Sequence, residues 1–135
     1  MHKRIVLLIL DGLPAGRSMN VAAMLMTGMS KIVPDFCGSP VTDGVGVSHP
    51  GIGTTPVIIM KARNFNVLQR AYGVAREKGI PAVPFFEKAA GLQTYEEYTA
   101  WLQNSDGSAE PLLGLALYGS REETSGAVKR CSLWK

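Results

Sequence analysis

The feature that most constrains the fold is the almost wholly apolar run Arg4–Leu10, near the start of the chain. Such a run predicts a β-strand covered on both faces, because a strand with one face in water alternates apolar and polar residues. The turn-forming residues of 11–16 (DGLPAG) interrupt it, and 18–30 is rich in Ala, Met and Leu, which favour a helix. The sequence therefore predicts a strand, turn and helix unit, with the turn at the strand's carboxyl end, where ligands of α/β proteins collect.

The rest of the chain alternates strand and helix patterns. Strands are expected at 56–61, 80–86 and 112–118, and helices at 65–78, 95–102 and 121–130, with short edge strands near 40–42 and in the tail 131–135. This alternation predicts a largely parallel sheet with helices on both faces. We therefore expect one three-layer α/β/α domain over 1–135, with four core strands and four helices.

Several helix ends carry recognisable signals. Asn64 is a good N-cap for the helix 65–78, and Gly79 fits the position just after its end. Thr94 and Ser120 are each followed three residues later by Glu, the spacing of a capping box. These signals predict helix starts at Tyr95 and Arg121.

The segment 33–55 is rich in glycine and proline, and a loop of this length in a compact domain tends to be functional or mobile. It contains Asp43 and His49, a pair that could orient an imidazole as a general base. The alternative is that Asp43 caps a turn and that His49 is an ordinary loop residue, ahead of Pro50, with no catalytic role. No nucleophile-elbow spacing is present, although Ser18, Cys37 and Ser48 are available nucleophiles.

Charge and cysteine content narrow the function classes. The net charge is +3, from 14 basic and 11 acidic residues, and the basic residues are scattered rather than clustered. A solvated surface explains this pattern better than a nucleic-acid footprint, which is usually a concentrated patch. Cys37 and Cys131 have neither CxxC spacing nor adjacent histidines, so we expect free thiols, no metal site and no cofactor.

No targeting or membrane segment is expected. The apolar run after the basic start MHKR stops at Asp11, too early for the hydrophobic region of a signal peptide, and no small-residue cleavage site follows. No stretch approaches the roughly 20 apolar residues of a membrane span. A cytoplasmic protein is the resulting expectation.

A set of short motifs, in order along the chain, resembles the uncharacterised DUF2000 family. They are DGLPAG at 11–16, NVAA at 20–23, DG at 43–44, SHPG at 48–51, PVIIMK at 56–61, TYEEY at 94–98 and LALYG at 115–119. Members of this family are similar in fold to the type 2 peptidyl-tRNA hydrolases. The resemblance implies a three-layer domain with a four-stranded mixed sheet, three strands parallel and one antiparallel.

The same resemblance bears on activity. Asn20 stands where the hydrolases place a functional lysine, and Met24 stands where they have glutamine. Glu87 falls near the position of a functional aspartate of the hydrolases, and Gln93-Thr94 falls near their Thr-Gln pair. Without the lysine, the site has no cation to hold a phosphate or stabilise developing negative charge.

Four candidate ligand-binding residues and one further candidate base emerge. Asn20 could orient a carbonyl or phosphate at the helix N-terminus, or simply hydrogen-bond nearby backbone. Arg17 could pair with an anion, and Ser18 adjoins it. The alternative, a solvated surface position, is the commoner one for an arginine. Glu87 leaves a strand at its carboxyl end, as functional groups often do, and a salt bridge to Lys88 or Arg17 is the alternative. Thr94 is first an N-cap and second a ligand contact.

The leading hypothesis is a domain that binds a small ligand or an RNA end in a cleft after the first strand, with Arg17, Ser18, Asn20 and Thr94 as contacts. One alternative is an ester or amide hydrolase related to peptidyl-tRNA hydrolase, with His49 or Glu87 as base and Asp43 beside His49. Another is a homodimeric structural or interaction module. The residues leave both an enzyme and a binding protein open.

Overall fold

The computed structural model describes residues 2–134 and contains a mixed sheet of five strands. These are β1 (Lys3–Leu10), β4 (Val57–Ala62), β5 (Ala82–Phe86), β6 (Leu112–Ser120) and β7 (Cys131–Leu133), in the order β5-β6-β1-β4-β7. β4 is parallel to β1, whereas β6 is antiparallel to β1 and β5, and β7 is antiparallel to β4. Three strands therefore run one way and two run the other. Only β1 and β4 pair in parallel, so the expectation of a largely parallel sheet is wrong.

The four expected core strands are present, but the four-stranded sheet implied by the family resemblance is wrong, because the tail adds a fifth strand. Met60 lies opposite Leu133, and the Trp134 N–H donates to the Ile59 carbonyl at 3.1 Å. This pairing makes β7 an edge strand, as the tail pattern predicted. The last residue of the predicted tail strand, Lys135, lies outside the described residues.

β1 is the centre of the sheet. Its residues from Ile5 to Leu10 are all buried, as the unbroken apolar run predicted. They lie between β4 and β6, with Ile5 opposite Val57 on one side and Tyr118 on the other. A strand that is paired on both edges and covered on both faces has no solvent-facing side for polar side chains. This explains why the run is apolar without interruption.

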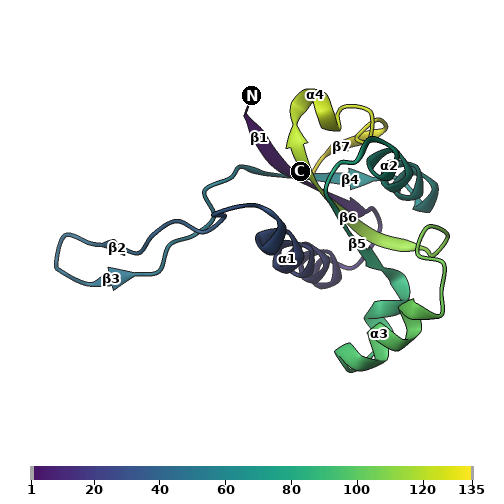
Figure 1. The fold of residues 1–135 in the computed structure, drawn as a ribbon, viewed down its shortest axis with the longest axis horizontal. Helices are drawn as coiled ribbons and strands as arrows, with labels where there is room; N and C mark the ends of the chain where they lie inside the picture. Colours follow the sequence, from purple (N-terminus) through teal and green to yellow (C-terminus); the bar gives the residue numbers. More distant parts are fainter. Residues whose placement is uncertain (1, 135) are drawn as a thin grey trace.

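Helices lie on both sides of this sheet. Figure 1 shows α1 (Ala15–Ile32) on one side and α2 (Phe65–Lys78) on the other, with α3 (Tyr95–Gln103) beyond the carboxyl end of β5. The short helix η1 (Glu87–Gly91) joins β5 to α3. Within residues 2–134, no helix combines the length and apolar content needed to cross a bilayer.

Two helix boundaries differ from the sequence expectation. α1 begins three residues before Ser18, because Pro14 occupies its N-cap and its carbonyl accepts the Ser18 N–H at 3.0 Å. α4 covers only Arg121–Thr124 instead of 121–130, and the chain then forms turns that end at Arg130 with a φ of +67°. The apolar pattern alone did not indicate that early end.

The predicted caps are confirmed. The Asn64 side chain accepts the Val67 N–H at 3.0 Å, and Gly79 adopts a left-handed φ of +69°. Ser120 and Glu123 form a reciprocal capping box. Thr94 accepts the Glu97 N–H at 3.1 Å, and the Glu97 carboxylate accepts from the backbone of Gln93, one residue before the cap.

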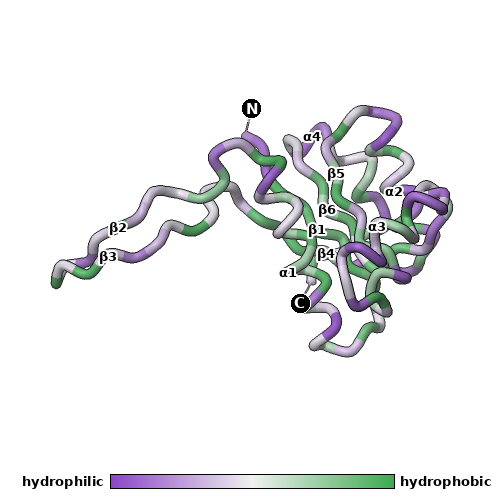
Figure 2. The backbone as a smooth tube through the Cα atoms, turned by 60° about the horizontal axis from the view of Figure 1, so that its bottom comes forward, coloured by the Kyte–Doolittle hydropathy of each residue, from purple (hydrophilic) through white to green (hydrophobic). Residues whose placement is uncertain are grey.

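The segment 34–56 forms a two-stranded arm that projects from the body. Its strands β2 (Val41–Thr42) and β3 (Ser48–His49) pair antiparallel in a sheet of their own. Figures 1 and 2 show the arm extending away from the five-stranded sheet in both views. The predicted strand near 40–42 therefore exists, but it belongs to this arm and not to the edge of the main sheet.

The arm is built by close backbone approach at its base. Gly38 donates its N–H to Ile52, Thr54 donates to Phe36, and both bonds are 2.8 Å long. A Cβ at Gly51 would overlap the Gly38 carbonyl, and one at Gly53 would overlap the Phe36 ring. The glycine-rich composition of this segment thus allows its two halves to pack against each other.

A glycine also sets how closely α1 approaches the sheet. A Cβ at Gly114 of β6 would lie 2.6 Å from Val21 Cγ1 and 3.2 Å from the Leu8 carbonyl oxygen. We expect Gly114→Ala to destabilise the fold by about 1–3 kcal/mol, because the added methyl group overpacks a site with backbone on one side. Urea unfolding followed by circular dichroism measures this change.

The matched control is Gly73→Ala in α2, where nothing lies within 4 Å of the added Cβ. This variant should gain about 0.5–1 kcal/mol, because alanine is the better helix former. Equal unfolding midpoints for the two variants would contradict this account of the contact between α1 and β6.

Candidate functional site

A cleft lies between α1 and the segment that runs from the end of β5 through η1 into α3. It has a volume of about 490 Å³ and is called here the α1–η1 cleft. Its polar lining comes from α1 (Asn20, Thr27) and from the start of α3 (Gln93, Thr94, Tyr95, Tyr98). Because β1 and β5 run in the same direction, their carboxyl ends meet at one edge of the sheet, and the cleft lies where such folds place ligands.

A second hollow of about 390 Å³ continues the cleft toward the N-terminus of α1. The two hollows share Asn20, Phe85 and Ala90, and the second adds Pro14 and Arg17. A ligand that spans both would therefore meet a guanidinium at one end.

Asn20 is the predicted residue that occupies the most informative position. It lines both hollows. Among residues 2–134, no hydrogen bond holds its side-chain amide, so the alternative role of fixing nearby backbone does not apply. Its oxygen and both amide hydrogens are available to a ligand.

Thr94 lines the cleft and caps α3, as the sequence predicted. Its hydroxyl oxygen accepts the Glu97 N–H at 3.1 Å, which leaves the hydroxyl hydrogen able to reach a ligand. Asn20 and Thr94, which are 74 positions apart in the sequence, thus line the same cleft.

The aromatic side of the cleft was missed at the sequence level. Tyr95 and Tyr98 line it with ring centroids 5.7 Å apart, and Tyr98 lies 6.2 Å from Trp101, which packs edge-on against Phe86 at 5.5 Å. Burial, with smaller contributions from Tyr95 and Tyr72, raises the pKa of the Tyr98 phenol above its ordinary value of 10.0. The phenol is therefore a neutral donor near pH 7. The spacing of aromatic residues at 95, 98 and 101 was the available signal.

Two other predicted residues do not line this cleft. Glu87 is the first residue of η1 and is exposed, and it does not contribute to either hollow. Ser18 is buried on another side of α1, where it faces a groove toward β4 and β7. No salt bridge between Glu87 and Lys88 or Arg17 occurs in the described part of the chain.

Asp43 and His49 do meet, at the far end of the arm. His49 Nε2 lies 2.8 Å from Asp43 Oδ2, and Asp43 Oδ1 accepts the N–H groups of Val45 and Val47 at 3.0 Å. The hydrogen bond from His49, followed by those from Val47 and Val45, lowers the pKa of Asp43 below its ordinary value of 3.8. The pair closes the hairpin turn and lies outside the body that contains the α1–η1 cleft (Figure 1).

No metal site accompanies the cleft. Within residues 2–134, no three His, Cys, Asp or Glu side chains are grouped closely enough to hold an ion. The polar groups of the cleft are amide, hydroxyl and guanidinium groups, which suit an organic or phosphate-bearing ligand better than a cation.

The fold and the cleft together define a mixed α/β protein with a ligand-sized hollow at the carboxyl edge of its sheet. The chain belongs to the family described as protein of unknown function (DUF2000), whose model matches residues 3–135. The family resemblance read from the motifs is therefore confirmed, whereas the likeness to peptidyl-tRNA hydrolases stays a prediction.

One solved structure shares this fold over its whole length. It is a protein of unknown function from Agrobacterium tumefaciens strain C58, with a TM-score of 0.91 and 19% identity, over 100% of this chain and 99% of the other. No curated protein matches the chain. At this identity, the likeness establishes the fold alone.

The turn at the arm's end gives a pH prediction. A carboxyl group whose pKa is lowered by folding stabilises the turn above its ordinary pKa, and this contribution is lost as the pH falls through the lowered value. We expect ¹³C NMR titration of Asp43 to give a pKa below 3.8 and His49→Ala to raise it.

Asp106 provides the control, because its pKa is lowered by hydrogen bonds from Ser108 and not by any group on the arm. The Asp106 titration should be the same in both proteins. An unchanged Asp43 pKa in His49→Ala would refute the role of the histidine.

Proposed function

We propose that this protein binds a small ligand or the end of an RNA strand in the α1–η1 cleft. The observation that carries the proposal is the side chain of Asn20, which lines both hollows with hydrogen-bonding groups that the described chain does not use. A volume of about 490 Å³ falls within the roughly 300–1,000 Å³ range of small-ligand sites.

The chemistry of the two ends suits a nucleotide. Tyr95 is 79% exposed and offers a ring on which a base can stack. Arg17 lines the other end, where its planar guanidinium can pair with a phosphate. Asn20, between them, can hydrogen-bond the sugar or a base edge.

Hydrolysis of an ester or amide is the weaker proposal. A general base has to lie within hydrogen-bond reach of the proton it removes, directly or through one water. Glu87 does not line the cleft, and the Asp43–His49 pair lies at the end of the arm, outside the body of its own chain. These positions favour binding over catalysis in the cleft.

The RNA-end part of the proposal rests on a fold assignment. We infer that the helices on either side of the sheet form the three-layer arrangement of the type 2 peptidyl-tRNA hydrolases, with β7 as an added edge strand. In that assignment Asn20 replaces the functional lysine, which fits a cleft that retains ligand recognition and lacks the cation used in catalysis.

Isothermal titration calorimetry with nucleoside monophosphates and a short single-stranded RNA tests the proposal. Asn20→Ala should weaken binding about 3- to 10-fold, the usual effect of losing a neutral hydrogen bond. Arg17→Ala should weaken binding more strongly for phosphorylated ligands than for the corresponding nucleosides.

The matched controls are Asn66→Ala and Arg121→Ala, which remove the same groups from α2 and α4, outside the cleft. Both should leave the affinities unchanged. Binding that is absent for every probe, or equally weakened by the control variants, would overturn the proposal.

A further inference from the structure

The arm exposes apolar side chains that its own body does not cover. Val45 is 86% exposed and Ile52 is 82% exposed, and Val41 and Val47 are also more than half exposed. A lone two-stranded hairpin is at best marginally stable in water, because it buries almost no apolar surface. The arm nevertheless has defined base and turn contacts, which include the Asp43–His49 pair.

The body carries a matching apolar groove. It lies between α1 and β7, is floored by β4, and has a volume of about 590 Å³. Met19 forms one wall and Trp134 the other, and Val57 and Ile59 form the floor. All four side chains are more than a third exposed, an unusual amount of apolar surface for one face of a small protein.

One polar group in this groove lacks a partner. Ser18 lines the groove and is buried, yet its hydroxyl makes no hydrogen bond within the described residues. Buried hydroxyl groups are normally satisfied, and leaving one unpaired costs free energy. Because the Ser18 oxygen is shielded from solvent, a segment docked in the groove could bond it only after the groove wall shifts.

Charge favours the arm as the segment that fills the groove. The arm, 34–56, contains Asp35 and Asp43 and no Lys or Arg, so the remainder of the chain holds all 14 basic residues and nine acidic ones. Lys61 does not line the groove, but its Nζ lies 5.7 Å from the centre of the ring of Trp134, which does. An acidic, apolar arm therefore complements an apolar groove that has a lysine beside it, on a body with a net positive charge.

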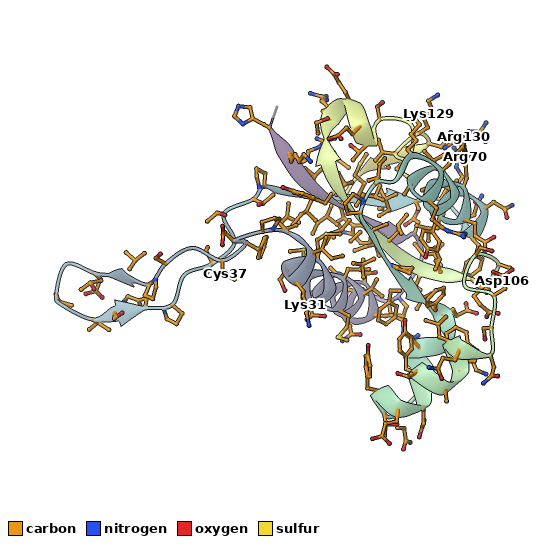
Figure 3. The ribbon with its side chains drawn as sticks, in the orientation of Figure 1. Lys31, Cys37, Arg70, Asp106, Lys129 and Arg130 are labelled. Atoms are coloured by element: carbon orange, nitrogen blue, oxygen red, sulfur yellow. The ribbon has the colours of Figure 1, made fainter. Side chains whose placement is uncertain are left out.

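We propose that the protein forms a two-fold homodimer in which the arm of each copy lies in the α1–β7 groove of the other. At about 3.3 Å per residue, the limb from Gly38 to Val45 can span roughly 23 Å. Figure 1 shows the arm extending away from its own body. Figure 3 shows Cys37 at the point where the arm leaves the body, beyond which the arm has no neighbouring element. A second copy is therefore the covering surface that the chain itself can provide.

The symmetry of this exchange doubles the area that one arm-to-groove contact buries. A two-fold axis makes each arm-to-groove contact occur twice, so both contacts count toward the roughly 1,200–2,000 Å² of a typical stable interface. The exchange would carry the Asp43–His49 pair of each copy onto the body of the other. This would account for the separation of that pair from the other predicted site residues within one chain.

Analytical ultracentrifugation of the full chain tests the proposal. The native protein should sediment as a dimer at micromolar concentration. Val45→Asp on the arm and Ile59→Asp in the groove should each raise the dimer dissociation constant at least about tenfold, because each places a charge in an apolar contact.

The matched control is Phe65→Asp, which alters an apolar residue of α2 with an exposure of 41%, close to the 38% of Ile59. It should remain dimeric, as should the cleft variant Asn20→Ala, so failure here is distinguishable from failure of the proposed ligand site. Unfolding curves identify any variant that fails to fold. Because Val45 is 86% exposed in the single chain, Val45→Asp should fold normally, and its effect on dimerisation decides the test even where Ile59→Asp is unstable.

Mixing provides a second readout. The Val45→Asp and Ile59→Asp proteins each lack one half of the contact, so an equal mixture retains one intact arm-to-groove contact and should form more dimer than either protein alone. A photo-crosslinking side chain at position 45 should attach to peptides of α1, β4 or β7 from the other copy.

A monomer at tens of micromolar would overturn the proposal. So would crosslinks from position 45 to the same copy or to the other copy's arm, since both would show that the groove is not filled by exchange. A dimer unaffected by both Val45→Asp and Ile59→Asp would place the interface elsewhere and refute the exchange as well.

Discussion

The structure depends on the burial of Ile5–Leu10 of β1. Its apolar side chains can leave water only if strands flank it on both edges and helices cover it on both faces. β4 and β6 provide the edges, and α1 and α2 provide the cover. Because all of these elements must pack against the same short strand, the burial of that strand sets the positions of the helices and of the loops between them.

The location of the α1–η1 cleft is a consequence of that arrangement. α1 follows β1, and η1 with α3 follows β5, and both departures occur at the same edge of the sheet. β6 lies between β1 and β5 and runs the opposite way, so no third helix begins there to fill the space. Asn20 and Thr94 are close because the sheet spaces their two helices one strand apart.

The arm presents the opposite situation. Only its base touches the body, where Phe36 packs against the core and the Pro56 carbonyl accepts the Ile5 N–H, and the five strands of the main sheet pair without it. Its backbone is nevertheless specified in detail, by the overlap that any Cβ at Gly51 would cause and by the carboxylate of Asp43, which satisfies two N–H groups of the turn. A segment that has so many local constraints and buries so little surface in its own copy is best explained if it packs against another copy of the chain.

Local chemistry was sufficient to predict much of this protein. The buried central strand, the helix of Phe65–Lys78 with its caps at Asn64 and Gly79, and the paired Ser120 and Glu123 depend on residues within a few positions of one another, and all are present. Long-range geometry decided the rest. The tail became a fifth strand because β4 had a free edge, and Ser18 turned away from Asn20 because neighbouring helical positions two apart face different directions. The extended arm could not be deduced from its glycines and prolines, since these mark only where the chain can turn, and not whether the resulting hairpin lies on its own body or projects from it.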